Sequence, residues 1–399
     1  MRSSRPVRAA CAALTAALLT TVAACGSADS PQAVDPPVDL AALDVGNYPT
    51  QPRRLGTVTS MPQARWIEAE RLGDYVPTPG DIDPRFVHAN PWMASVFLEP
   101  DKSLGRFMAI DRFAEAAPDF IGGFVSSGES EPNNDGIELV NAVMIFPDEQ
   151  RAAAAAIALE QLDFGYAANQ PIEIPGYPAA KAHWQPHKQS IGSWYATGHL
   201  VVYTWIYDYP KMFLKQVDKQ ALLDLTRKSL DTVVPSIAEF TPTPSDKMLE
   251  LPRDREDIRA RTLPRPKDDG WINPPGAYAA RTSRHFASNP LEVAQFIDEN
   301  GVDLYSVDGA EVYRARDVAG AQAVRDEMGG LTRKFTRTAA PKDLPTALCK
   351  EYIGRQKRLT IRFYCAVSYD RYAAYTWSNQ LLDAQQRISA QYALLVNTK

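Results

Sequence analysis

Several residue types that carry chemistry are scarce in this sequence. Its 399 residues include 4 cysteines and 5 histidines, and so few cysteines exclude a zinc site built on thiolates. Lysine and arginine number 43 against 48 aspartate and glutamate, which gives a net charge of −5. A chain without a basic surplus cannot neutralise a run of phosphates, so we expect no nucleic-acid partner.

Motifs for catalysis, metals and cofactors are also missing. The sequence has no glycine-rich phosphate loop, and the string nearest to a serine nucleophile elbow, around Ser126, lacks the first glycine. We therefore read Ser126 as a loop residue. A calcium-like string from Glu131 has Ala142 in place of the bidentate ligand, which favours a hairpin turn. His183 and His187 are four residues apart, but a proline between them favours a surface turn over a helical metal pair. We predict no catalytic residue, metal or cofactor.

The longest uncharged apolar run lies at the N-terminus, in residues 9–24, after a segment with three arginines and no acid. This order is typical of a secretory signal peptide. The run has sixteen residues, and about 20 are needed to cross the hydrocarbon core as a helix. We therefore expect residues 1–24 to direct export and to form no permanent membrane span.

The run ends in Val-Ala-Ala-Cys-Gly at residues 22–26, which resembles the lipobox of bacterial lipoproteins. The resemblance implies that Cys25 becomes an acylated N-terminus, with residues 25–38 as a small, polar, proline-broken tether. Acyl chains would then hold the protein on the outer face of the cell membrane. The alternative is an ordinary signal peptide cut near Ala24, which leaves Cys25 as a free thiol.

Two cysteines remain after Cys11 and Cys25 are assigned to the signal and the anchor. Cys349 and Cys365 flank a polar turn followed by a strand-like run, so an exported chain is expected to join them in a cross-strand disulfide. A loop of this length stabilises a fold by about 3 kcal/mol in the chain-entropy account. The alternative is a reactive or metal-binding pair, which would need basic groups or histidines nearby.

Prolines and repeats indicate two related domains. Seven prolines fall between residues 239 and 275, so we place a first domain at 39–240, a proline-rich linker at 241–274 and a second domain at 275–399. Tyr203-Thr204-Trp205 recurs as Tyr375-Thr376-Trp377, and each copy lies in an order of strand, helix, hairpin and helix. We predict an α+β fold with internal duplication, each domain an antiparallel sheet with helices packed on one face.

Aromatic residues gather in the hairpin predicted at 190–208. Trp194 lies in its first strand, and Tyr203, Trp205 and Tyr207 alternate along one face of its second strand. Residues on the opposite face are apolar as well. Either the strand is covered on both sides, or these four aromatics line a groove that grips an acyl chain or a sugar.

The layout as a whole resembles a family of secreted two-domain lipoproteins of mycobacteria and their nocardioform relatives. The lipobox, residues 43–49, residues 260–264 and the ending from Cys349 through Cys365 to residues 370–372 carry the resemblance. The order of the second domain is similar to that of extracellular sensor domains of mycobacterial receptor Ser/Thr kinases.

The resemblance implies no catalytic residues. We expect a non-catalytic envelope protein that binds a lipid, a glycolipid or an envelope protein as a sensor, carrier or accessory protein. The alternative is an envelope lipid or glycan hydrolase, which would bring serine, histidine and aspartate together in a pocket.

Overall fold

The computed structural model describes residues 38–89, 95–100, 102–165, 169–266, 275–355 and 361–398. The predicted signal peptide, the predicted lipidation site Cys25 and the predicted tether up to residue 37 lie outside these residues, as do residues 356–360. Among the described residues, no helix combines the length and apolar character that a membrane crossing requires.

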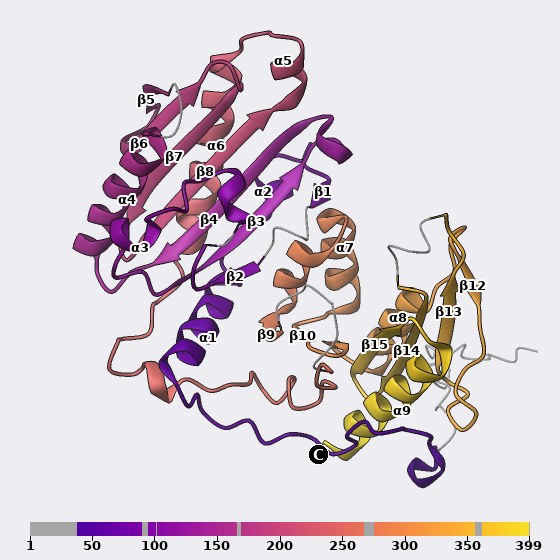
Figure 1. Cartoon of the computed structure of the whole chain (residues 1–399). Coiled ribbons are helices and arrows are strands. Elements are labelled where there is room, and N and C mark those ends of the chain that lie inside the picture. Colours follow the sequence, from indigo (N-terminus) through magenta and orange to yellow (C-terminus); the bar gives the residue numbers. More distant parts are fainter. Residues whose placement is uncertain are drawn as a thin grey trace, which may run out of the picture. The chain divides into compact units, whose positions relative to one another are not determined.

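The first sheet is antiparallel and has the strand order β1-β3-β4-β8-β7-β6-β5, with β2 also paired to β3 (Figure 1). Its strands are β1 (His88–Ala89), β2 (Ser95–Phe97), β3 (Gly122–Glu129), β4 (Ile137–Ile145), β5 (Gln170–Ile174), β6 (Tyr177–Gln185), β7 (Ser190–Thr197) and β8 (Leu200–Asp208). Its helical segments are α1 (Met61–Gly73), α2 (Pro79–Ile82), η2 (Leu104–Arg106), α3 (Phe113–Ala116), η3 (Pro132–Asn134), α4 (Glu149–Phe164), α5 (Tyr209–Phe213) and α6 (Lys219–Ile237).

The second sheet is antiparallel and has the order β12-β13-β14-β15-β11-β10-β9. Its strands are β9 (Gly276–Ala279), β10 (Leu304–Val307), β11 (Glu311–Arg314), β12 (Phe335–Arg337), β13 (Leu348–Tyr352), β14 (Phe363–Tyr369) and β15 (Tyr372–Ser378). Its helical segments are η5 (Ala280–Phe286), α7 (Pro290–Asn300), α8 (Val318–Met328) and α9 (Leu381–Asn397), while η1 (Leu40–Ala42) and η4 (Met248–Glu250) lie in the connecting segments.

The two sheets repeat one topology, which supports the predicted duplication. Each half runs along the chain through two strands, a helix, four strands and a long closing helix, the first from β3 to α6 and the second from β10 to α9. The spatial orders match as well, because β3-β4-β8-β7-β6-β5 corresponds strand for strand to β10-β11-β15-β14-β13-β12. The two Tyr-Thr-Trp triplets lie in the equivalent strands β8 and β15. The α+β class with two antiparallel sheets is confirmed.

The helices cover both faces of each sheet, whereas we expected them on one face. In the first sheet, Val202 packs with residues of α1 and α6, and its neighbour Tyr203 packs with residues of α4 on the other face. In the second sheet, α9 packs on one face and α7 and α8 on the other. The physical reason is that the central strands are apolar on both faces, so one helical layer would leave half of their side chains in water.

Local sequence signals place several helices correctly. Asp148 and Asp317 cap α4 and α8 by accepting from backbone N–H groups three residues on. The sequence predicts one helix over residues 211–234 that ends at Pro235, and this prediction is wrong. The chain makes the short α5, passes Lys215 in a left-handed conformation and starts α6 after Asp218. Pro235 does not end α6, which continues to the buried Ile237. The loss of one backbone hydrogen bond at Pro235 is offset there by apolar burial.

The disulfide between Cys349 and Cys365 is present, and it joins residues directly opposite each other on β13 and β14. The cross-strand prediction is therefore confirmed. Both cysteines are fully buried beneath α9.

The segments outside the sheets are packed rather than open. Leu43 and the predicted linker residue Ile258 belong to the core on the α9 face, and Leu263 is buried against the same helix. The hydroxyl of Tyr48 donates to Asp383 of α9 at 2.5 Å. Residues 39–50, which we placed in the first domain, therefore pack on the second sheet, and the linker expected at 241–274 is in part a folded segment of the second half. Residues 267–274 of that linker are outside the described residues.

Candidate functional site

The aromatic face of the hairpin formed by β7 and β8 is part of the hydrophobic core. Trp194 and Tyr203 are fully buried, and Trp205 is 8% exposed. The Trp194 indole donates to Asp163 of α4 at 2.9 Å, and the Tyr203 hydroxyl donates to the carbonyl of Phe107. Phe107 packs against both Tyr203 and Trp205. The groove considered for an acyl chain or a sugar is therefore filled by α4 and the segment that follows η2.

Tyr207, the fourth aromatic of that face, is half-buried and packs between Trp205 and Tyr209. Three clefts in the described part of the chain, including the two described below, are lined by residues other than Trp194, Tyr203, Trp205 and Tyr207. The structure thus brings the four predicted residues together, but as packing rather than as an open surface.

The histidine motif also behaves differently from the prediction. His183 is a buried residue of β6, with its Nδ1 atom 3.6 Å from a Glu160 carboxylate oxygen, and His187 is exposed in the following turn. The surface-turn prediction is wrong for His183. Across the described ranges no group of three histidine, cysteine or acidic residues is arranged to hold a metal ion.

A buried serine and histidine meet where the two halves touch. Ser126 lies in β3, not in the loop that we expected, and its Oγ atom is 2.8 Å from Nδ1 of His285 in η5. The other ring nitrogen, Nε2, is 3.1 Å from the carbonyl oxygen of Val76. A carbonyl only accepts, so Nε2 carries the proton and Nδ1 accepts from the serine hydroxyl.

This pair lacks the features of a catalytic dyad. Burial, aided by the charge of Arg284, lowers the pKa of His285 to about 4 and keeps the ring neutral. Ser126 is 1% exposed, and among the described residues no carboxylate hydrogen-bonds to the ring. A nucleophile needs access to substrate and a base that can take up its proton. The pair therefore joins the two halves rather than attacking a substrate.

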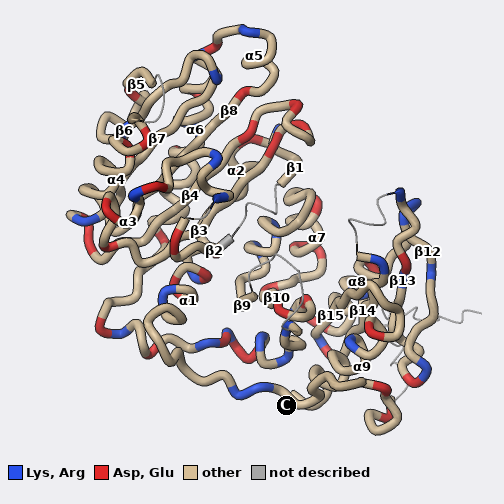
Figure 2. The backbone as a smooth tube through the Cα atoms, viewed as in Figure 1, with Lys and Arg blue, Asp and Glu red and all other residues tan. Residues whose placement is uncertain are grey.

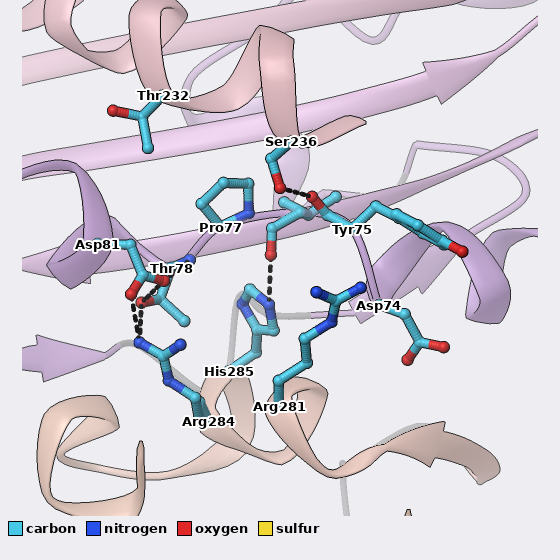
Figure 3. A pocket seen from close by; sticks show the side chains of 11 residues that line it. Asp74, Tyr75, Pro77, Thr78, Asp81, Thr232, Ser236, Arg281, Arg284 and His285 are labelled. Atoms are coloured by element: carbon cyan, nitrogen blue, oxygen red, sulfur yellow. Dashed lines mark hydrogen bonds and ion pairs between the residues drawn. The ribbon is translucent and has the colours of Figure 1, made fainter. Parts of the chain in front are cut away.

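A cleft of about 240 Å³ opens beside the pair. Its walls come from three segments far apart in sequence: the connection between α1 and α2, the end of α6, and η5. Figure 3 shows Arg281 extending from η5 towards Tyr75, between His285 and Asp74. The guanidinium lies 5.2 Å from the centre of the Tyr75 ring. The lining residues are Asp74, Tyr75, Val76, Pro77, Thr78, Asp81, Thr232, Ser236, Arg281, Arg284 and His285.

The two acids of the cleft are already bonded on both carboxylate oxygens. Asp74 accepts from the backbone N–H of Ala279, from the Thr282 hydroxyl and from Arg255. Asp81 accepts from Arg284 at 2.5 Å and from the backbone and hydroxyl of Thr78. Burial alone would raise the pKa of Asp81, but these contacts outweigh it and lower the pKa. Both acids tie the two halves together through these hydrogen bonds and ion pairs.

A second cleft of about 290 Å³ adjoins the first, and the two share Asp74 and Tyr75. It is lined by α1 and by residues 251–255, in a stretch where basic and acidic residues alternate (Figure 2). Glu70 lies in its wall, where the Trp66 indole and the Ala277 backbone N–H donate to its carboxyl group. Burial raises the pKa of Glu70 to about 8 against the opposing charge of Arg259, so this side chain is neutral at pH 7.

The polar side chains of the first cleft are engaged within the protein. Every serine, threonine, histidine and acid of the first cleft makes a hydrogen bond within the protein. Sequence reasoning missed this cleft because Tyr75 and Arg281 are about two hundred residues apart and neither lies in a motif. The one usable signal was the duplication, because ligands often bind where two domains meet.

Comparisons with known proteins agree with the division into two halves. The family model described as "Domain of unknown function (DUF7373) N-terminal" matches residues 55–253, and the corresponding C-terminal model matches residues 258–398. No curated protein matches the chain. One solved structure that matches is the extracellular domain of PknH from Mycobacterium tuberculosis, at 12% identity and a TM-score of 0.29, covering 46% of this chain and 100% of that one. A score this low establishes no common fold. The two models together span most of the sequence, and the chain therefore belongs to the DUF7373 family.

Proposed function

We propose that this chain is a lipid-anchored protein on the outer face of the cell membrane that binds a ligand or partner in the envelope without transforming it. The observation that carries the binding role is the pair of adjoining clefts between the two halves. They are hollow and lined by charged and aromatic groups, but their hydroxyls, acids and histidine are committed to internal hydrogen bonds. A site of this kind holds a molecule and has no nucleophile to offer it.

Export and anchoring rest on two further features. The N-terminal segment combines three arginines, a sixteen-residue uncharged run and the Val-Ala-Ala-Cys-Gly motif at 22–26. The disulfide between Cys349 and Cys365 supports an oxidising compartment, because cytosolic thiols are kept reduced. Acylation of Cys25 would place the folded halves on the membrane through the segment before residue 38.

The hydrolase alternative would draw on the contact between Ser126 and His285. That contact does not favour a hydrolase, because Ser126 is buried away from solvent. The second ring nitrogen of His285 bonds a backbone carbonyl, whereas in a catalytic triad it bonds the carboxylate that orients the ring. We therefore expect Ser126→Ala to leave unchanged whatever small molecule or protein co-purifies with the chain.

The anchor is tested by Cys25→Ser, with Cys11→Ser as a matched control that makes the same chemical change inside the signal segment. Wild type and Cys11→Ser are expected in the particulate fraction and in the detergent phase of a Triton X-114 partition. Cys25→Ser is expected to lose both. If Cys25→Ser stays in the particulate fraction as firmly as the control, the lipid anchor is refuted.

A further inference from the structure

One guanidinium in the first cleft, that of Arg281, has no ion-pair partner among the described residues. Arg281 is exposed, and its guanidinium makes a cation–π contact with the ring of Tyr75. The neighbouring Arg284 and Arg255, by contrast, are ion-paired with Asp81 and Asp74. No carboxylate within the described ranges lies at ion-pair distance from Arg281, so its charge is balanced by nothing that the cleft supplies.

The other polar groups around Arg281 already make hydrogen bonds within the protein. The Ser236 hydroxyl donates to the carbonyl of Tyr75 at 2.7 Å, and the Thr232 hydroxyl donates to the carbonyl of Lys228 at 2.9 Å. Both acids have every oxygen occupied, as described above, and His285 donates its one proton to Val76. A molecule in this cleft would therefore meet the five N–H donors of the planar Arg281 guanidinium, next to the Tyr75 ring that Arg281 contacts.

The adjoining cleft repeats this pattern with Arg253. This side chain is partly buried and makes one long contact, 3.4 Å, to the carbonyl of Leu55, and its Nε atom is buried without a hydrogen-bond partner among the described residues. The nearby Asp254 accepts from three backbone N–H groups, of Arg255, Arg259 and Ala260. Glu70 is neutral, so the wall beside Arg253 carries less negative charge than its sequence suggests.

We propose that the two clefts form one binding site for a small organic anion, a carboxylate or a phosphate ester. Its charged group is held by Arg281, its body lies beside Tyr75, and its far end reaches towards Arg253. This assignment rests on the proposed binding function and names the ligand class of that site. A guanidinium fork matches the paired oxygens of carboxylate and phosphate, and an aromatic face beside it suits the carbon body of such a ligand. The volumes of about 240 and 290 Å³ suit a metabolite-sized molecule.

The test uses the purified chain and two probes, inorganic phosphate and succinate, at an ionic strength held constant with chloride. Binding is read as a saturable rise in melting temperature and by isothermal titration. Arg281→Gln and Arg253→Gln remove the two guanidinium groups. Arg333→Gln is the matched control, because Arg333 is also exposed, has no ion pair in the described structure and lies outside both clefts.

We expect wild type and Arg333→Gln to bind at least one probe, and Arg281→Gln to bind it at least about tenfold more weakly. Arg253→Gln is expected to weaken succinate, which has two charged ends, more than phosphate. Preference for phosphate or for succinate identifies which of the two chemistries the natural ligand carries. Equal binding by wild type and Arg281→Gln overturns the proposal, and so does the absence of a saturable response to either probe.

Failure here is distinguishable from failure of the proposed function. If neither probe binds but the chain isolated from its own membrane retains a neutral ligand, the anion assignment is wrong and the binding function stands. If the chain binds neither probe and carries nothing from the membrane, both are wrong. Circular dichroism of the variants separates loss of binding from loss of fold, since Arg281 is exposed and its replacement removes no buried contact.

Discussion

Glu70 gives the sharpest test of how the two halves are joined, because it lies on α1, accepts from the backbone of Ala277 in β9 and is buried with a pKa of about 8. Replacement by glutamine keeps the shape and an oxygen that can accept from the Trp66 indole at 2.7 Å. The replacement removes the ionisable carboxyl group, so this position no longer titrates. The folded-state pKa is above the 4.5 of a free side chain, so this contribution to stability is fully present below about pH 4.5 and is lost as the pH rises to about 8.

The size of the effect follows from the shift. One pKa unit corresponds to about 1.4 kcal/mol, so between about pH 5 and about pH 9 wild type should lose on the order of 4 kcal/mol more than Glu70→Gln. The assay is denaturant unfolding of both proteins across that range, followed by tryptophan fluorescence and circular dichroism. Other buried groups that titrate, Asp163 with its pKa raised to about 6 and His285 with its pKa lowered to about 4, are common to both proteins and cancel in the difference.

Two outcomes would refute this reasoning. Parallel pH profiles for wild type and Glu70→Gln would mean that Glu70 is solvated in the folded protein. A wild type that gains stability relative to Glu70→Gln as the pH rises would mean that the charged form is favoured there, for instance by Arg259, and that burial does not dominate.

Three further predictions concern stability and are measured by thermal or denaturant unfolding. Replacing both Cys349 and Cys365 with serine should lower the free energy of unfolding by about 3 kcal/mol, and reduction of wild type should reproduce the loss; unchanged unfolding would mean that the bridge adds nothing. His285→Ala should cost about 2 to 4 kcal/mol, because it opens a cavity and leaves the Ser126 hydroxyl and the Val76 carbonyl unpaired; a cost close to zero would show that the halves are not joined there. Tyr203→Phe should cost about 1 to 2 kcal/mol through the unpaired Phe107 carbonyl, whereas the exposed control Tyr369→Phe should cost close to nothing.

Local signals in the sequence were sufficient for much of the fold. A carboxylate at a helix start acts on amides three residues away, so Asp148 and Asp317 could be assigned as caps without any knowledge of the rest. The repeated Tyr-Thr-Trp triplet located two equivalent strands, and the duplication followed from the order of elements around them. An even pair of cysteines in a chain expected to be exported was enough to predict the disulfide, which joins opposite residues of β13 and β14.

Features that depend on packing between distant segments could not be predicted from the sequence. The alternation in β8 showed that both faces are apolar, but it carried no information on what covers Tyr203, and the answer is Phe107, about a hundred residues away. Pro235 was read as a helix end because the burial of Ile237 beyond it depends on the core that α6 joins. The clefts could not be predicted from the sequence for the same reason, since Tyr75 and Arg281 meet only when the two halves pack together.

The most direct measurement of the central claim is native mass spectrometry of the mature chain isolated from its own membrane, comparing wild type with Arg281→Gln and the control Arg333→Gln. We expect wild type and Arg333→Gln to carry the same added mass of a small acidic molecule, released intact and unmodified on denaturation, and Arg281→Gln to lack it. Identical spectra for all three proteins, or release of a cleaved product, would contradict a cleft that binds without catalysis.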